Sequence, residues 1–337
     1  MLPKITFLKQ LDSNTDTLVV PVYKGKIVSR GVDVLDIQSR ALIDNYLANA
    51  QDFTGKSGQG AYIPLHSDAA CARVVLIGLG DPDRIESGDV ETAGGKLVEV
   101  LKQVGAQNVA ITLADSDTAC ELDSAHFAAR LVNGLVLGAY DFDIYKSRTA
   151  CTDADDGASQ DNKLESVSVV ADFYAAAEDA FRPFSATAEG VYLARNFVNE
   201  PPNILYPESF ANRIRDELKP LGVDVDILDE KKIRKMGMGA IDAVGTGSVH
   251  PPRLVTMHWR GTEHAGGRHP LGFVGKGITF DSGGLSLKPA SGMDTMKLDM
   301  AGAAAVVGLM KAIARTGLSR EIVAVVPLAE NMPAHNA

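Results

Sequence analysis

The chain has 337 residues, of which 45% are hydrophobic, and this size and composition suit two domains with full apolar cores. The formal net charge of −10 argues against non-specific binding to nucleic acid or to an anionic membrane, because both require an excess of Lys and Arg. There is no apolar stretch of about 18 residues, and the N-terminal apolar run is too short for a signal peptide. We therefore expect no membrane partner and a cytoplasmic location.

The cysteine residues also indicate a reducing compartment such as the cytoplasm. Cys71, Cys120 and Cys151 are odd in number, widely spaced and free of any CxxC pattern. A disulfide framework normally uses an even set, so we expect incidental thiols in a reducing compartment.

Strand-like and helix-like segments alternate over the first 165 residues. The apolar run RVVLIGL at Arg73–Leu79 ends in a turn, as a buried strand does. A polar, acidic stretch at Thr149–Glu165 is typical of a surface loop or connector. The alternation predicts a layered α/β domain over residues 1–165 with a largely parallel sheet. The other expected elements are strands at Ile5–Leu8, Thr17–Val22 and Asn108–Leu113, and helices at Thr92–Val104 and Ser124–Tyr140.

Residues 166–337 are also predicted to be α/β. A helical region at Asp172–Val198 is expected to be interrupted near Pro183, which lacks a backbone N–H. The chain ends shortly after a core-like strand with no covering helix, so we expect this second domain to be incomplete. The other expected elements are strands at Val167–Val170, Val223–Leu228, Arg253–Trp259, Gly272–Phe280 and Glu321–Leu328, helix Pro207–Leu218 and the buried helix Met300–Arg315.

Charged side chains gather in one glycine-rich segment, Gly275–Asp299. A lysine inside an apolar strand needs a specific partner or a route to solvent, and glycines allow close backbone approach. Two carboxylates and two lysines around one strand end favour a functional site. The charged residues of this segment are Lys276, Asp281, Lys288, Asp294, Lys297 and Asp299.

Each of these residues also has a structural explanation. Asp299 could cap the following helix, and Asp281 could form a turn. Lys276 could be a sheet-edge charge, and Lys288 a solvated loop residue. Taken singly, the residues favour these structural roles, and taken together they favour a site, so pattern alone leaves both interpretations open.

Other motifs are incomplete. Gly55-Lys56-Ser57 lacks the upstream glycine of a phosphate-binding loop, and Gly78-Leu79-Gly80 lacks the third glycine of a dinucleotide fingerprint. There is no HExxH, and the spacing of His264 and His269 does not suit two ligands on one helical face. Gly247–His250 is not a GxSxG elbow.

The segments VGKGITFDSGGLSLKP and MDTMKLDMAGAAAV closely resemble the catalytic core of the leucyl aminopeptidase family. RNFVNEPPN at Arg195–Asn203 and PLAENMP at Pro327–Pro333 agree with this resemblance, which is strong from about Ala194 onward and weak over the first 165 residues. It implies an N-terminal macro-like α/β domain at 1–165 and a catalytic α/β metallopeptidase domain at 166–337, with a mixed sheet covered by helices.

The resemblance also implies a pair of divalent cations, Mn²⁺ or Zn²⁺, with Mg²⁺ as a third candidate. Lys276 matches a lysine that ligates one metal, Asp281 the carboxylate that bridges both, and Asp299 a further ligand. Lys288 matches the catalytic lysine near the scissile carbonyl, and Met296 lines the pocket for the substrate's first side chain. The implied substrates are peptides with an N-terminal leucine or a similar residue.

These residue types suit that chemistry. A lysine ligates a metal only as its neutral amine, so the cation itself must drive deprotonation. A bridging carboxylate holds two cations that can generate hydroxide at neutral pH. A charged Lys288 would stabilise the developing oxyanion. An apolar pocket discriminates between side chains by only a few kcal/mol, so specificity should be broad.

This sequence departs from the family pattern in one respect. The remaining Asp and Glu ligands and the arginine that holds a bicarbonate base lie in a motif NTDAEGRL, which is absent here. Because ligand loss weakens metal affinity, we expect this chain to be inactive or nearly so, and poorly soluble through exposed apolar surface. The family's homohexamer is expected of full-length members.

Two other classes of function stay open. One is a non-catalytic, DNA-binding or regulatory module, which the acidic net charge does not favour. The other is a truncated pseudoenzyme without catalytic function.

Overall fold

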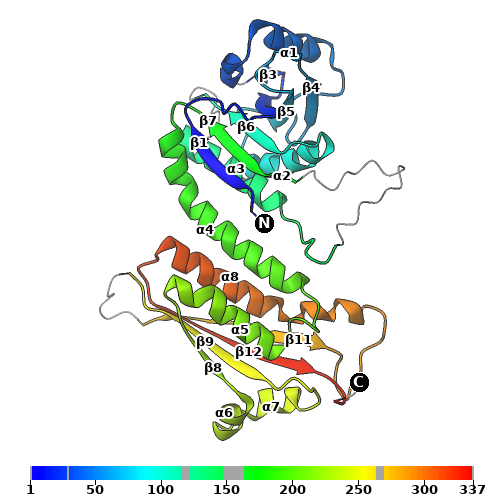
Figure 1. The fold of residues 1–337 in the computed structure, drawn as a ribbon, viewed down its shortest axis with the longest axis vertical. Helices are drawn as coiled ribbons and strands as arrows, with labels where there is room; N and C mark the ends of the chain where they lie inside the picture. The colour runs from blue at the N-terminus through cyan, green and yellow to red at the C-terminus, as the bar shows by residue number, and fades with distance from the viewer. Residues whose placement is uncertain (1, 29, 115–121, 147–162, 263–268, 336–337) are drawn as a thin grey trace. The chain divides into compact units, whose positions relative to one another are not determined.

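A computed structural model describes residues 2–28, 30–114, 122–146, 163–262 and 269–335 of the chain. The chain divides into two compact units, Met1–Ser185 and Ala186–Ala337, and the division falls inside helix α4 (Tyr174–Asn199). Each unit combines a sheet with helices (Figure 1). The predicted α/β class is therefore confirmed.

The sheet of the first unit is largely parallel, as predicted. Only the pairs β4–β5 and β3–β2 are antiparallel among the pairings of the described residues. Every residue of β2 is buried, since helices cover both faces of this sheet. The strand order is β1 (Lys4–Leu8), β7 (Ser166–Val170), β6 (Asn108–Thr112), β2 (Thr17–Tyr23), β5 (Arg73–Gly80) and β4 (Gly60–Pro64), with β3 (Ile27–Val28) beside β2.

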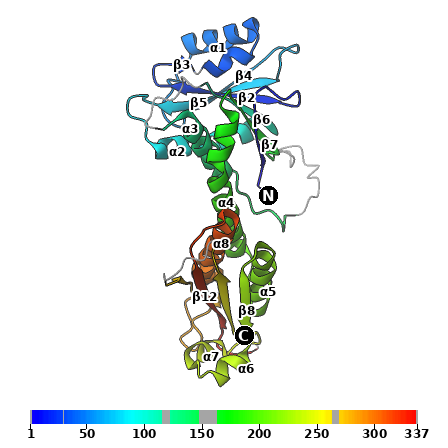
Figure 2. The same ribbon diagram turned by 90° about the vertical axis from the view of Figure 1, so that its left-hand side faces the viewer.

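The helices of this unit lie on opposite faces of its sheet. Helix α1 (Ile37–Asn49) covers one face, and α2 (Ser87–Gln103) with α3 (Ser124–Gly138) covers the other (Figure 2). Ile43 and Leu47 of α1 pack on the alternate strand residues Leu18, Val20 and Val22. The sequence prediction omitted α1 and the short helix η1 (Arg30–Val34), because α1 has only a weak apolar stripe.

Helices α2 and α3 approach each other closely through glycines. A Cβ atom on Gly94 would lie 2.0 Å from the carbonyl oxygen of Leu131, and one on Gly134 would lie 1.9 Å from that of Glu91. These distances are far below van der Waals contact, so the helix spacing depends on both glycines lacking side chains.

Helix α4 runs unbroken through Pro183, so the predicted interruption is wrong. A proline inside a helix removes one backbone hydrogen bond and costs about 3 kcal/mol. Apolar residues are buried on both sides of this position, among them Ala177 and Phe181 before it and Ala188 and Tyr192 after it. Their burial offsets that cost, which local propensity alone does not reveal.

The second unit has a mixed sheet. Strand β12 pairs in parallel with β10 and β11 and antiparallel with β9, which pairs antiparallel with β8. Helices α5 and α8 pack over the sheet, and the core includes Phe210, Val255, Val307 and Val326. The strands are β8 (Asp224–Leu228), β9 (Arg253–Trp259), β10 (Leu271–Val274), β11 (Gly277–Asp281) and β12 (Ile322–Asn331). The helices are α5 (Pro207–Leu218), η3 (Lys219–Leu221), α6 (Glu230–Lys235), α7 (Gly239–Gly245), η4 (Met293–Met300) and α8 (Ala301–Thr316).

Two predicted strands of this unit have different bounds. The segment Gly272–Phe280 is not one strand but two, because the chain leaves the ladder at Gly275 and Lys276. The carbonyl of Lys276 instead accepts a hydrogen bond from the N–H of Ala303 in α8, at 2.8 Å. Strand β12 continues past Leu328 to Asn331, which brings a polar residue to its end.

Two further predictions concern membrane-spanning segments and the cysteine residues. No helix in the described part of the chain is long and apolar enough to cross a membrane. Cys71 is a buried free thiol, whereas Cys120 and Cys151 lie outside the described residues, as do His264 and most of the predicted connector Thr149–Glu165.

The glycine contact between α2 and α3 yields a paired test. We expect Gly94→Ala to destabilise the protein by about 1–3 kcal/mol, as overpacking does, because its methyl group would overlap the Leu131 carbonyl. Gly95→Ala is the matched control, since its Cβ would come no closer than 3.7 Å to the Gly134 oxygen, and it should gain about 0.5–1 kcal/mol. Urea unfolding followed by circular dichroism measures both, and equal stabilities would contradict the packing argument.

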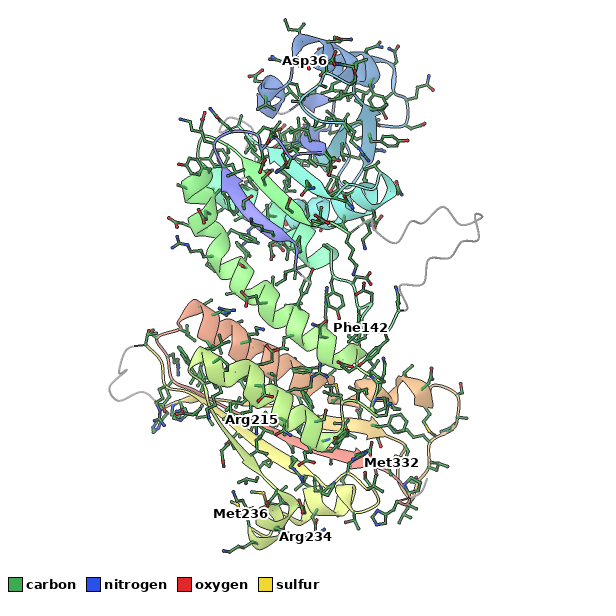
Figure 3. The ribbon with its side chains drawn as sticks, in the orientation of Figure 1. Asp36, Phe142, Arg215, Arg234, Met236 and Met332 are labelled. Atoms are coloured by element: carbon green, nitrogen blue, oxygen red, sulfur yellow. The ribbon has the colours of Figure 1, made fainter. Side chains whose placement is uncertain are left out.

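The cap of α1 makes stability depend on acid pH. Asp36 (Figure 3) accepts hydrogen bonds from the N–H and hydroxyl of Ser39, which lower the pKa of Asp36 from 3.8 to about 2. A lowered folded-state pKa gives stability that is present above about pH 4 and is lost as pH falls toward 2. Asp36→Asn keeps a capping oxygen but cannot titrate. The melting-temperature difference between wild type and this variant should therefore shrink from pH 4 to pH 2, and a constant difference would contradict the assignment.

Candidate metal centre

The first element of the predicted site is an ion pair between Lys276 and Asp299. The Lys276 Nζ atom donates a hydrogen bond to Asp299 Oδ1 at 2.8 Å and lies 2.7 Å from Oδ2. The Asp299 side chain is 21% exposed, whereas the Lys276 side chain is 60% exposed. The lysine thus reaches a mostly buried carboxylate from the solvent side.

Glycines around Lys276 place it against the start of α8. A Cβ atom on Gly275 would lie 2.5 Å from the carbonyl oxygen of Gly302, and one on Gly302 would lie 3.1 Å from the N atom of Lys276. The hydrogen bond from Ala303 N–H to the Lys276 carbonyl fixes the same contact. Lys276 therefore lies at a break between two strands, and the expectation of a lysine within an apolar strand is wrong.

The second element is Asp281, the last residue of β11. Lys288 Nζ lies 2.6 Å from its Oδ2 atom, and Oδ1 accepts from Asn331 Nδ2 at 2.7 Å and from the N–H of Gly283 at 3.0 Å. Burial raises the pKa of Asp281, but hydrogen bonds from Lys288, Gly283 and Asn331 outweigh it and lower the pKa to about 2. The carboxylate is consequently ionised at neutral pH.

Lys288 joins Asp281 to helix η4. Its Nζ atom contacts the Met296 sulfur at 3.1 Å as well as Asp281. Gly283 and Gly284 have φ values of 90° and 64°, in the left-handed region that favours glycine, and they turn the chain after β11. That turn returns Lys288 to the strand end from which the loop departs.

Helix η4 connects the two ion pairs. In a 3₁₀-helix, residues three apart lie on the same side, about 6 Å apart along the axis. Met296, which contacts Lys288, and Asp299, which contacts Lys276, have this spacing. The two carboxylates and two lysines predicted to form a site are therefore gathered around β11 and η4.

Of the two structural roles considered for the carboxylates, the helix cap at Asp299 is wrong and the turn at Asp281 is confirmed. Asp299 does not cap α8, because the N-cap is Met300 and no side chain bonds there. Asp281 does form a turn with Gly283 and also binds Lys288, so both roles hold. Of the remaining charged residues, Lys297 bonds the Asn199 carbonyl at 2.7 Å, and Asp294 is exposed.

The donor set fits divalent cations. Carboxylate oxygens and an amine nitrogen suit Mn²⁺ and Zn²⁺, and the oxygens also suit Mg²⁺. The buried Asp299 Oδ2 atom lies 2.7 Å from Lys276 Nζ and accepts no hydrogen bond of proper geometry from the described residues. No cluster of three His, Cys, Asp or Glu side chains is found in the described ranges, and the amine of Lys276 is needed to complete even three donors.

Sequence reasoning missed Asn331 and Ser282 at this site. Asn331 bonds Asp281, and Ser282 Oγ donates to the Asn331 carbonyl at 2.7 Å. The available signal was the parallel pairing of β11 with β12, whose carboxyl ends meet at one edge, but β12 was predicted to end three residues too early.

Two of the incomplete motifs make contacts within the described part of the chain. In the Gly55–Ser57 loop, the N–H of Lys56 donates to Gln59 Oε1 at 3.0 Å and is not free for a phosphate. Ser248 is buried and donates to Glu330.

The carboxylates and the lysine amine gathered beside these strand ends are donors of the kind that divalent cations take in hydrolytic enzymes. Models of the cytosol aminopeptidase family match twice, the N-terminal domain at residues 19–149 and the catalytic domain at 192–337. The chain belongs to the cytosol aminopeptidase family, which confirms the family predicted from the sequence.

Individual relatives agree with this assignment. A probable cytosol aminopeptidase of Brucella ovis is 40% identical over 316 residues, covering 92% of this chain and 61% of the relative. One from Rhodopseudomonas palustris is 41% identical over 297 residues, covering 88% and 57%. The chain spans 54–61% of the length of the curated relatives it matches.

Solved structures show the same fold. The bottromycin maturation enzyme BotP in complex with Mn is 30% identical, with a TM-score of 0.74 and coverage of 95% of this chain and 60% of that one. A mutant of tomato leucine aminopeptidase is 26% identical, with a TM-score of 0.75 and coverage of 98% and 64%.

The close approach of Gly275 to α8 yields a second glycine test. We expect Gly275→Ala to lower the free energy of unfolding by about 1–3 kcal/mol, because the added methyl group would overlap the Gly302 carbonyl. Gly272→Ala is the control in the preceding strand, since no atom lies within 4 Å of its Cβ position. Chemical unfolding of both variants measures the difference. Wild-type stability of Gly275→Ala would show that α8 does not constrain Lys276.

Proposed function

We propose that this protein is a metal-dependent leucyl aminopeptidase that releases N-terminal amino acids, leucine-like ones preferred, from peptides. The observation that supports it most is the pair of carboxylate–lysine contacts joined through η4, Lys276–Asp299 and Lys288–Asp281. Membership of the cytosol aminopeptidase family supports the peptidase class.

Lys276, Asp281 and Asp299 would hold the divalent cations. Bound cations supply a hydroxide nucleophile at neutral pH and polarise the peptide carbonyl. Mn²⁺ is the first ion to test, because the similar BotP structure is described in complex with Mn, and Zn²⁺ and Mg²⁺ are the alternatives.

Lys288 would stabilise the reacting carbonyl group by direct contact. Its side chain is a third exposed, and its ammonium group contacts Asp281 Oδ2 and the Met296 sulfur. This group can donate a hydrogen bond to the carbonyl oxygen as negative charge develops there. Met296 offers an apolar, adaptable contact to the first side chain of the substrate. Such a contact favours leucine only modestly over similar side chains.

Some parts of the proposal concern longer family members. A bicarbonate general base, a homohexamer and a cytoplasmic location are proposed from the resemblance, and none of the described residues of this chain is assigned to them. The three donor side chains Lys276, Asp281 and Asp299 are few for two cations that each take four or more ligands. We therefore propose weak metal binding and low peptidase activity for the 337-residue chain itself.

Metal binding provides a test with a control from the same helix. A ligand that binds only the folded protein raises its melting temperature with concentration, so Mn²⁺ should stabilise the wild type. Asp299→Asn should require at least about tenfold more Mn²⁺ for the same rise, because it loses a charged oxygen donor. Asp294→Asn, an exposed residue of η4, should behave as wild type. Equal responses of the two variants to Mn²⁺ would remove Asp299 from the site.

The same proteins are then assayed for hydrolysis of leucine p-nitroanilide with Mn²⁺. We expect low turnover that EDTA and Asp299→Asn abolish. Robust turnover by the chain would contradict its proposed low activity. Turnover that neither EDTA nor Asp299→Asn reduces would contradict the metal-dependent function.

A further inference from the structure

Asn331 lies beside Asp281 at the end of the neighbouring strand. The parallel register of β11 and β12 pairs Asp281 with Asn331, so the two side chains extend from the same face of the sheet. Asn331 Nδ2 donates to Asp281 Oδ1 at 2.7 Å. Met332, labelled in Figure 3, follows directly after this strand.

The main chain of Asn331 holds the loop that follows Asp281. Its carbonyl oxygen accepts hydrogen bonds from the N–H of Ser282 at 3.1 Å and from the Ser282 hydroxyl at 2.7 Å. The Ser282 carbonyl in turn accepts from the N–H of Lys288 at 2.9 Å. A Cβ atom on Gly284 would lie 2.5 Å from Asn331 Oδ1, so the loop packs directly on the amide. Asn331 thus contacts the start of the loop 282–288, and Ser282 in turn bonds Lys288 at its end.

The amide suits this position for a chemical reason. Asp281 Oδ1 receives two N–H donors, from Asn331 and Gly283, while Oδ2 faces Lys288. Two donors on one oxygen fix the plane of the carboxylate, and a neutral amide does so without adding charge. Groups that orient metal-binding carboxylates in this way raise metal affinity by about 10–100-fold.

The adjacent residue, Glu330, provides a contrast. Consecutive side chains of a strand point to opposite faces, and Glu330 accepts from the buried hydroxyl of Ser248 instead of contacting Asp281. Its role is to hold the segment around Ser248. A substitution of Glu330 is therefore a control that affects the stability of the fold but does not touch the contacts of Asp281.

We propose that Asn331 is a positioning residue that orients the Asp281 carboxylate and holds the loop 282–288, so that Asp281 binds cations and Lys288 lies beside it. The part of this inference that concerns cations rests on the proposed function. The part that concerns the loop stands on the contacts of this chain alone.

Hydrogen–deuterium exchange of the metal-free chain tests the loop. Asn331→Ala should reduce the protection of the Gly283 amide, whose acceptor is Asp281 Oδ1, and of the Gly284 amide, which packs on the Asn331 side chain. Asn331→Asp should do the same at neutral pH because it keeps the shape but loses the N–H donor. Glu330→Gln should lower the melting temperature but leave these amides protected. Wild-type protection in Asn331→Asp, or equal loss in Glu330→Gln, would overturn the proposal.

Titration with Mn²⁺, with the free ion followed by electron paramagnetic resonance, tests the site. Asn331→Ala should weaken binding by about 10–100-fold, whereas Glu330→Gln should not change it. Unchanged affinity in Asn331→Ala would overturn the metal-binding role. If the wild type itself binds no Mn²⁺, the proposed function of the chain and the metal-binding role both fail, while the exchange experiment still decides the loop role.

Discussion

A carboxylate that leaves water must be compensated by positive charge or by N–H donors, and the second unit is arranged around two such groups. Asp281 and Asp299 are only 15% and 21% exposed, and each has a lysine within 2.8 Å. Removing either lysine would leave a largely buried charge without its main partner. The break between β10 and β11 places one of these lysines, Lys276, beside its carboxylate.

Glycine makes this compensation geometrically feasible. Lys276 reaches Asp299 where the strand break approaches α8 closely, at a distance that excludes a side chain at Gly275 and leaves little room for one at Gly302. Lys288 reaches Asp281 because Gly283 and Gly284 adopt positive φ values and reverse the chain. The glycines that made this segment conspicuous in the sequence are thus required by the ion pairs, and the charged side chains and the backbone turns form one arrangement.

The sequence was sufficient for the α/β class and for most strands, and it marked the segment in which the two lysine–carboxylate pairs lie, because apolar runs and clustered charges are local signals. It was insufficient where contacts with residues far away in the sequence determine the local structure. Lys276 leaves the strand because its carbonyl bonds Ala303 in α8, and Pro183 stays helical because residues on both sides are buried. Asn331 had no local signal, since its partner lies fifty residues earlier and becomes adjacent only through the pairing of β11 with β12.

The two units show why a glycine-rich segment is ambiguous until its hydrogen bonds are known. In the first unit, Gln59 Oε1 accepts from the N–H groups of Thr54 and Lys56, so the loop satisfies its own donors and offers little to an anion. In the second unit, the glycines bring together charged side chains, and the buried Asp299 Oδ2 atom faces Lys276 without a hydrogen bond of proper geometry. Similar composition therefore gives a closed turn in one case and a cluster of paired carboxylates and lysines in the other, because the glycines of the second segment bring charged side chains together.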